Sequence, residues 1–208
     1  MSVESRLDEG LAALPFALPE GARDRLLAYL RLLDKWNRVH NLTAIRDPEQ
    51  MVVLHVLDSL AVLPHLASAS TLLDVGTGGG LPGIPLAIAR PDLEVTLLDS
   101  SQKKTIFLAQ AKAELALSNA TVACTRVEDW HPPRPYDAVV SRAFAELADF
   151  VAGAKHLVAP GGALFAMKGV NPVEEIARLP ATHRVENVLE LKVPSLEAKR
   201  HLVLMKAA

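Results

Sequence analysis

A glycine-rich stretch that follows a short apolar run is the clearest candidate for a ligand site. Residues 71–75 are Thr-Leu-Leu-Asp-Val, and residues 76–85 are Gly-Thr-Gly-Gly-Gly-Leu-Pro-Gly-Ile-Pro. A turn with so few side chains lets its backbone lie directly against a ligand. The spacing of Gly78, Gly80 and Gly83 satisfies the dinucleotide fingerprint, although a lone match of this kind is also compatible with a tight structural turn.

The charge beside this loop indicates which ligand it suits. Asp74 lies at the carboxyl end of the strand, where it would repel the pyrophosphate that a dinucleotide places over such a loop. A cationic ligand fits that position better, and S-adenosylmethionine (AdoMet) carries both an ammonium and a sulfonium. We therefore expect Asp74, Gly76, Gly78 and Gly80 to contact AdoMet.

Further cofactor contacts are expected at the ends of the next two strands. Asp99 lies 21 residues after Gly78, close to the spacing of about 20 at which an acid accepts hydrogen bonds from ribose hydroxyls in such sheets. An alternative role for Asp99 is to cap the helix that starts near residue 101, although Ser100 is the expected cap and also a cofactor contact. After the third strand, Val127 and Glu128 lie where adenine would bind.

The end of the fourth strand is expected to face the transferred methyl group. Residues 138–144 read Ala-Val-Val-Ser-Arg-Ala-Phe and lack the Pro-Pro-aromatic pattern of enzymes that methylate exocyclic base amines. Methylation of a pyrimidine carbon needs a cysteine nucleophile, but Cys124 is expected to be an ordinary buried thiol. An acceptor with a free lone pair, such as guanine N7, needs neither device.

Three cations at strand ends are candidates for the acceptor side. Arg142 follows the fourth strand, Lys168 ends the fifth and Arg200 begins the last. We expect Arg142 to donate to guanine O6 or to a phosphate, and the three together to clamp a nucleotide and form the catalytic set. The alternative, that Lys168 and Arg200 are exposed surface charges, stays open. Phe144 is expected to belong to the core.

The elements that must position these residues fall into two parts. Leucines recur at helical spacing over residues 20–65, which predicts an N-terminal helical cap, assigned to residues 1–66. Residues 67–208 alternate apolar runs with amphipathic stretches, which predicts a doubly wound, mostly parallel α/β sheet forming one structural unit with the cap. Strands are expected at 71–75, 94–98, 121–124, 138–141 and 163–167, with helices near 83–90, 101–117 and 145–158. The short connection between strand-like residues 185–193 and 201–206 predicts an antiparallel hairpin.

Composition narrows the class of protein. The chain has 208 residues, a net charge of −2 and a single cysteine, which predicts one compact domain with a small appendage and no disulfide. Acidic residues near the N-terminus argue against an export signal, and no histidine spacing suggests a metal site, so we expect a metal-free cytoplasmic protein that does not enter membranes. Residues 22–46 carry +4 and residues 192–206 carry +3, leaving −9 for the rest. Charge alone favours two solvated faces over an RNA surface, and it does not settle the partner.

Several segments in this order resemble one family, the bacterial 16S ribosomal RNA guanine-N7 methyltransferases, also called glucose-inhibited division protein B. The segments are Trp-Asn-Arg-Val-His-Asn-Leu-Thr at 36–43, His-Val-Leu-Asp-Ser-Leu at 55–60, the glycine loop with its preceding acid, Leu-Asp-Ser at 98–100, Arg-Val-Glu at 126–128, Ser-Arg-Ala-Phe at 141–144, Lys-Gly at 168–169 and Arg-His-Leu-Val at 200–203. One departure is Lys104, where the family more often has arginine; a cation is kept.

The resemblance implies AdoMet-dependent methylation of N7 of one guanine in 16S rRNA. It also implies cofactor contacts and RNA contacts: the former at Gly76, Leu81, Val127, Glu128 and Arg142, the latter at Arg126, Lys168 and Arg200. The expected partner is 16S rRNA or the small ribosomal subunit, bound by a monomer. Whether the substrate is free rRNA, an assembly intermediate or the finished subunit stays open.

Two other functions and one structural question also stay open. The loop and Asp99 are compatible with a nucleotide-dependent oxidoreductase, and the fold is compatible with an RNA-binding module without turnover. In the helical cap, Asn37, Asn41, His55 and Asp58 interrupt an apolar pattern. They form either a hydrogen-bonded network or contacts to rRNA, and we favour the network.

Overall fold

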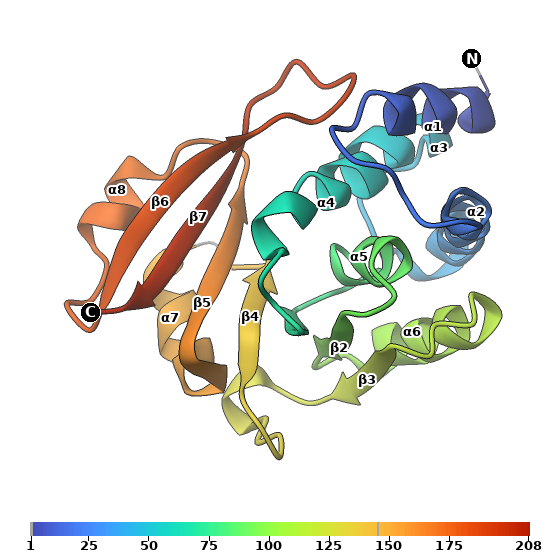
Figure 1. Ribbon diagram of the computed structural model, residues 1–208. Helices are drawn as coiled ribbons and strands as arrows, with labels where there is room; N and C mark the ends of the chain where they lie inside the picture. The colour runs from blue at the N-terminus through green and yellow to red at the C-terminus, as the bar shows by residue number, and fades with distance from the viewer. Residues whose placement is uncertain (1, 145) are drawn as a thin grey trace.

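The computed structural model describes residues 2–144 and 146–208, which form a sheet flanked by helices (Figure 1). The N-terminal part is helical, with α1 (Val3–Ala12), α2 (Ala22–His40), α3 (Pro48–Met51), a π-helical segment η1 (Val52–Leu57), α4 (Asp58–Leu60) and a 3-10 turn η2 (Leu63–Leu66). The sheet region follows with β1 (Thr71–Val75), α5 (Gly83–Ala89), β2 (Glu94–Asp99), α6 (Gln102–Glu114), β3 (Ala120–Cys124), η3 (Val127–Asp129), β4 (Tyr136–Ser141), α7 (Leu147–Ala154), η4 (Lys155–Leu157), β5 (Val158–Lys168), α8 (Val173–Ala177), β6 (His183–Leu191) and β7 (Arg200–Ala207).

The seven strands have the order β3-β2-β1-β4-β5-β7-β6. Strands β1 to β5 are parallel, and β7 pairs antiparallel with both β5 and β6. The predicted doubly wound sheet and the C-terminal hairpin are therefore confirmed. The chain leaves β1 toward β2 on one side, while β4 lies on the other, so the carboxyl end of β1 is the switch point where such sheets bind ligands.

Helices cover both faces of the sheet. Figure 1 shows the N-terminal helices with α5 and α6 on one side and α7 on the other. All five residues of β1 are buried because the strand is covered on both faces: Leu72 packs into the apolar cluster under the cap, and Leu73 into the one under α7. The cap cluster runs without a break from Leu7 of α1 to Phe107 of α6, so cap and sheet share one core.

The helical cap contains more structure than its leucine pattern predicts. Helix α1 was not expected; the Ser2 side chain caps it by accepting a hydrogen bond from the Ser5 N–H. Ion pairs hold α1 against α2, since Arg31 pairs with Glu4 and Arg23 with Asp8. Helix α8 was also missed.

Much of the basic charge at the two ends of the chain is paired within the protein. Besides Arg23 and Arg31, Arg38 on α2 pairs with Asp34. In the C-terminal stretch, Lys199 and Lys206 also have carboxylate partners. These pairs support the interpretation of two solvated faces over a broad RNA surface. In the part of the chain that the structure describes, no helix has the length and apolarity to cross a membrane.

Candidate cofactor and acceptor site

The glycine loop after β1 has a backbone conformation and a close contact that residues with side chains would not tolerate. Gly76, Gly78 and Gly80 have φ angles of 68°, 58° and 87°, in the left-handed region that glycine adopts without strain. A Cβ on Gly76 would lie 2.7 Å from the Cβ of Ala143. The absence of a side chain therefore lets the loop pack directly against the segment that follows β4.

Hydrogen bonds to Tyr29 of the helical cap and to Asp74 of β1 hold this loop in place. The buried Tyr29 hydroxyl on α2 donates to the Gly79 carbonyl over 2.6 Å. The Thr77 hydroxyl and the Gly83 N–H donate to Oδ2 of Asp74 over 2.6 and 2.7 Å. These bonds hold the loop near both of its ends, at Thr77 and Gly83, and at Gly79 between them.

Asp74 itself is completely buried. Burial raises the pKa of its carboxyl group to about 6, against the two hydrogen bonds that lower it. Its Oδ1 atom has no hydrogen-bond partner among the described residues. Because Asp74 lines neither cavity described below, the structure gives it a role in holding the loop, and its expected contact with the cofactor stays a prediction.

The first cavity, here called the loop cavity, has a volume of about 230 Å³ and opens beside the glycine loop. It is lined by Val75, Gly76, Leu98, Asp99, Ser100, Thr125, Arg126, Val127, Glu128, Ala143 and Phe144. Five of the expected cofactor residues, at positions 76, 99, 100, 127 and 128, line it. Gly78, Gly80, Leu81 and Arg142 do not. Arg126, expected on the RNA side, lies in this cavity instead.

Asp99 is buried at the base of the loop cavity, where three donors meet its carboxylate. The N–H of Gly78 lies 2.9 Å from Oδ2, the N–H of Ser101 2.9 Å from Oδ1, and Lys104 Nζ 3.4 Å from Oδ2. Asp99 therefore supports the start of α6 while facing the cavity. The expected cap, Ser100, is wrong: Ser101 occupies the N-cap position of α6, and no side chain caps that helix.

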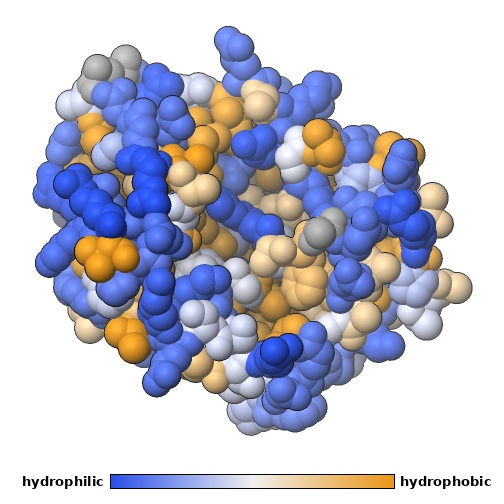
Figure 2. Space-filling view, turned by 180° about the vertical axis from the view of Figure 1, so that it is seen from behind, coloured by the Kyte–Doolittle hydropathy of each residue, from blue (hydrophilic) through white to orange (hydrophobic). Residues whose placement is uncertain are grey.

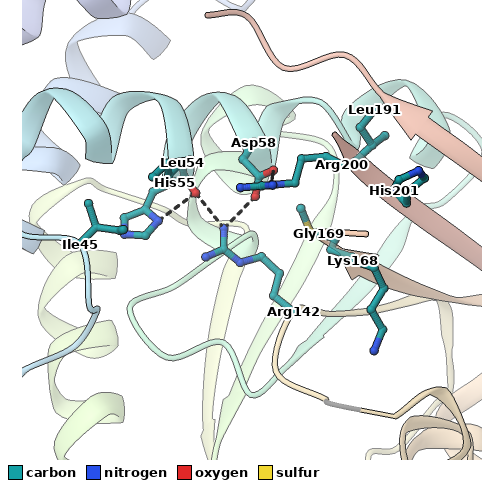
Figure 3. A pocket seen from close by; sticks show the side chains of 11 residues that line it. Ile45, Leu54, His55, Asp58, Arg142, Lys168, Gly169, Leu191, Arg200 and His201 are labelled. Carbon is teal, nitrogen blue, oxygen red and sulfur yellow. Dashed lines mark hydrogen bonds and ion pairs between the residues drawn. The ribbon is translucent and has the colours of Figure 1, made fainter. Parts of the chain in front are cut away.

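The second cavity, here called the arginine cavity, has a volume of about 330 Å³. It is lined by Ile45, Leu54, His55, Asp58, Arg142, Met167, Lys168, Gly169, Leu191, Arg200 and His201 (Figure 3). The ends of β4 and β5 and the start of β7 bring Arg142, Lys168 and Arg200 to this one cavity. Neighbouring strand ends at one edge of the sheet explain why residues so far apart in sequence meet there.

The buried carboxylate of Asp58 joins two of these cations. The sequence pattern instead predicts that Asp58 belongs to the polar network of the helical cap. Oδ2 of Asp58 lies 3.2 Å from Arg142 Nη1, and Oδ1 lies 3.3 Å from Arg200 Nε. Burial raises the pKa of Asp58, whereas the two arginines lower it. A charged side chain within an apolar helical pattern needs a buried partner, and this was the one signal that could have indicated the pairing.

Lys168 lines the same cavity, but its amine is directed elsewhere. Nζ lies 2.7 Å from Oε2 of Glu175 on α8 and 3.1 Å from the Phe144 carbonyl. Figure 3 shows the amine pointing away from the two guanidinium groups. The structure therefore brings Arg142 and Arg200 together through Asp58 and holds the Lys168 amine apart from them.

The expected polar network in the cap is present around Asn37 and His55. Asn37 accepts from the Thr43 N–H and donates to the Ile45 carbonyl, both over 2.9 Å. The Thr43 hydroxyl lies 2.8 Å from Nε2 of His55. Asn41 belongs to the same corner of the cap, since its side-chain oxygen accepts from an arginine on the following loop. Asp58 is the exception, because it pairs with the arginines instead.

This network reaches the arginine cavity through one carbonyl. The Leu54 carbonyl, in the π-helical segment η1, lies 3.0 Å from Nδ1 of His55 and 3.4 Å from Nη1 of Arg142. Burial, with the positive charge of Arg142, lowers the pKa of His55 to about 4. His55 is therefore neutral near pH 7. A π-helical turn at a functional site is a common association.

The structure confirms the expected core position of Phe144 but not the expected burial of Cys124. Phe144 stacks on Phe150 of the core, with ring centroids 5.1 Å apart, although it also borders the loop cavity. Cys124 was expected to be buried and is exposed, because its side chain lies at the last position of β3, outside both cavities. The thiol is therefore not placed where it could attack a base.

Comparison with known proteins agrees with the resemblance seen in the sequence. The family model described as "GidB: rRNA small subunit methyltransferase G" matches residues 22–203. A protein named ribosomal RNA small subunit methyltransferase G from Burkholderia ambifaria is 55% identical over 207 residues, covering 97% of this chain and 91% of the relative. Its counterpart from Burkholderia thailandensis is 56% identical, covering 97% and 90%.

Solved structures agree on the fold. The O-methyltransferase TomG from Streptomyces achromogenes, in complex with SAM, has a TM-score of 0.63 at 16% identity and covers 100% of this chain and 99% of its own. The O-methyltransferase from Bacillus cereus, in complex with SAH, has a TM-score of 0.62 at 17% identity and covers both chains fully. These identities support a shared fold alone, whereas the family match decides against an oxidoreductase. The chain belongs to the GidB family, rRNA small subunit methyltransferase G.

Proposed function

We propose that this protein transfers the methyl group of AdoMet to N7 of one guanine in 16S rRNA. The observation that carries the proposal is the segment after β4, which separates the two cavities. Arg142 lines the arginine cavity, and the next two residues, Ala143 and Phe144, line the loop cavity. A methyl donor in one cavity and a base in the other would meet at this segment.

The residues of the loop cavity fit AdoMet. The Asp99 carboxylate suits a pair of ribose hydroxyls, and the buried Val127 offers an apolar surface to a flat base. Gly76 leaves space where a side chain would collide with Ala143. AdoMet supplies a methyl group already activated by its sulfonium, so the protein has to hold it and exclude competing nucleophiles.

The residues of the arginine cavity fit a guanine nucleotide. A guanidinium donates well to guanine O6 and to phosphate oxygens, and two guanidinium groups face this cavity. The N7 lone pair forms the new bond to carbon while the carbon–sulfur bond breaks, and the positive charge moves from sulfur to the base. No proton is transferred, so no general base is needed. Positioning of this kind can contribute several kcal/mol, roughly 7 to 11 in favourable cases.

The family match supports ribosomal RNA as the substrate class. Since one chain provides both cavities, we propose that a monomer is sufficient for activity, which the sedimentation of active protein would test. A substrate in the ribosome also implies a cytoplasmic enzyme.

The decisive experiment measures transfer of labelled methyl from AdoMet to small subunits from a strain that lacks the enzyme, followed by mapping of the modified base. We expect label on one guanine N7, and loss of most transfer in Arg142→Ala. Asp34→Asn, which alters an ion pair with the exposed Arg38 on α2 and lies outside both cavities, should retain transfer. Label on protein or on a small metabolite would refute the substrate. Full methylation by Arg142→Ala would refute the site.

Free 16S rRNA, an assembly intermediate and the finished subunit are compared in the same assay. The form with the highest kcat/KM is the substrate. If none accepts label but RNA still binds, the protein is a binding module instead.

A further inference from the structure

Asp58 connects three parts of the chain that are far apart in sequence. It is the first residue of α4 in the helical cap, and its two oxygens face Arg142 after β4 and Arg200 at the start of β7 (Figure 3). Besides the Leu54 carbonyl, which also contacts Arg142, the cap therefore contacts the acceptor side of the sheet through this carboxylate, placed between the two guanidinium groups.

The Asp58 carboxylate is buried and held in place, whereas the two arginine side chains are partly accessible to solvent. The Asp58 side chain is 7% exposed, whereas those of Arg142 and Arg200 are each 25% exposed. A buried ion is held in place because moving it away from its partners leaves an uncompensated charge. The anchored atoms are therefore those of Asp58, and the cavity side of each guanidinium stays open.

After pairing with Asp58, Arg142 and Arg200 keep a net positive charge and, within the described residues, free N–H donors that suit a nucleotide. Two guanidinium groups against one carboxylate leave a net charge of +1 at this point, which matches one phosphodiester. Arg142 directs Nη1 to Asp58 and the Leu54 carbonyl, and Arg200 uses Nε for Asp58 and Nη1 for the Lys199 carbonyl. Arg142 Nε and Nη2 and Arg200 Nη2 have no partner among the described residues, so donors remain for RNA.

We propose that Asp58 is a positioning residue that fixes Arg142 and Arg200 in the orientation that receives the target nucleotide. The inference rests on the proposed function, since it concerns the acceptor side of the same transfer. Without the carboxylate, two long side chains that repel each other must be ordered by the RNA itself. Ordering such side chains on binding lowers affinity, and the expected effect of Asp58→Asn is roughly a 10- to 100-fold loss of kcat/KM for small subunits.

The experiment compares Asp58→Asn, which removes the charge at nearly constant shape, with Asp58→Glu, which keeps it. A positioning role predicts that Asp58→Asn loses activity toward small subunits, mainly through KM, while the AdoMet dissociation constant stays within about twofold of the parent. Asp58→Glu should recover part of the loss. Asp34→Asn, at a half-buried carboxylate that pairs with Arg38 on α2, is the matched control for removal of an ion-paired carboxylate.

A merely structural role gives a different set of results. It predicts a lower melting temperature, weaker AdoMet binding and no benefit from the glutamate. Parental kcat/KM in Asp58→Asn would overturn the inference, as would a loss that Asp58→Glu does not reduce while AdoMet binding falls in parallel.

A double-mutant cycle with Arg200→Gln provides a second, independent measurement of the same pairing. Asp58→Asn should cost less activity in the Arg200→Gln background than in the parent, because the contact with Arg200 is already lost there and only the contact with Arg142 remains to be broken. Additive losses would contradict the inference. The parent enzyme separates the two proposals: if it does not methylate small subunits, the proposed function fails, whereas an active parent with an unaffected cycle overturns only the role of Asp58.

Discussion

The backbone N–H of Gly78 donates a hydrogen bond of 2.9 Å to Oδ2 of Asp99. This bond joins the loop after β1 to the end of β2, two of the places where the sequence predicts cofactor contacts. Since the same carboxylate accepts from the Ser101 N–H, loop, strand end and helix start are ordered by one side chain. A site ordered in advance binds its ligand without spending binding free energy on ordering the loop.

Asp99→Asn should weaken AdoMet binding by roughly 10- to 100-fold. The asparagine has one acceptor oxygen in place of two and no charge, so either Gly78 or Ser101 loses its partner, and hydrogen bonds to charged groups contribute about 1.5–3 kcal/mol. Titration calorimetry with AdoMet measures the change. Asp92→Asn, at an exposed carboxylate that pairs with Arg90, is the control. Unchanged affinity in Asp99→Asn would mean that the acid only supports the start of α6.

Gly76→Ala should abolish measurable AdoMet binding, whereas Gly21→Ala should not. Both glycines have similar positive φ angles, 68° and 74°, so both variants carry comparable backbone strain, on the order of 1 kcal/mol. At Gly21 the new Cβ meets nothing within 4 Å, but at Gly76 it lies 2.7 Å from Ala143. The loop must move away from β4, which changes the wall of the loop cavity.

The melting temperature and the AdoMet affinity are measured on Gly76→Ala and Gly21→Ala. Together they separate the effect of backbone strain, which both variants share, from that of the collision with Ala143, which only Gly76→Ala has. Equal affinities in the two variants would show that the close approach of Gly76 to Ala143 is not needed for cofactor binding.

The sequence predicted the features that depend on local signals. The apolar run before Gly76, the loop glycines and the short connection before Arg200 were sufficient to place the switch point and the hairpin. The pairing of Asp58 with Arg142 was not predictable in this way, because 84 residues separate them and no spacing rule links a cap helix to a strand end. Cys124 was misassigned because one residue decides whether a strand end faces the core or solvent.

The interpretation of Asp74 shows the same limit in another form. Sequence position gives its charge and its strand end but not whether the side chain points up to the ligand or down under the loop. The structure shows it under the loop, bonded to Thr77 and Gly83. The charge argument for a cationic ligand thus predicted the cofactor without giving the contact.

Asp74→Asn should flatten one part of the stability profile with pH. The folded pKa of about 6 lies above the ordinary value of 3.8, so the native protein binds this proton more tightly than the unfolded chain. The free energy of unfolding therefore decreases as pH rises from about 4 to about 6, by on the order of 3 kcal/mol if Asp74 acted alone. Thermal unfolding followed by circular dichroism, parent against variant, measures the difference. Equal pH dependence in both would contradict the assigned pKa.

His55→Gln should also change the pH dependence of the free energy of unfolding, but with the opposite sign to Asp74→Asn. The folded pKa of about 4 lies below the ordinary value of 6.5, so the unfolded chain binds the proton more tightly. Stability is then complete above about pH 6.5 and is lost as pH falls toward 4, by roughly 3 kcal/mol for this group alone. Glutamine has no such titration but can still bond the Thr43 hydroxyl, so the variant should lose less stability between pH 6.5 and 4 than the parent. His131→Gln, at an exposed ring, should retain the parental profile. If His55→Gln also retains it, His55 is not held neutral by burial beside Arg142.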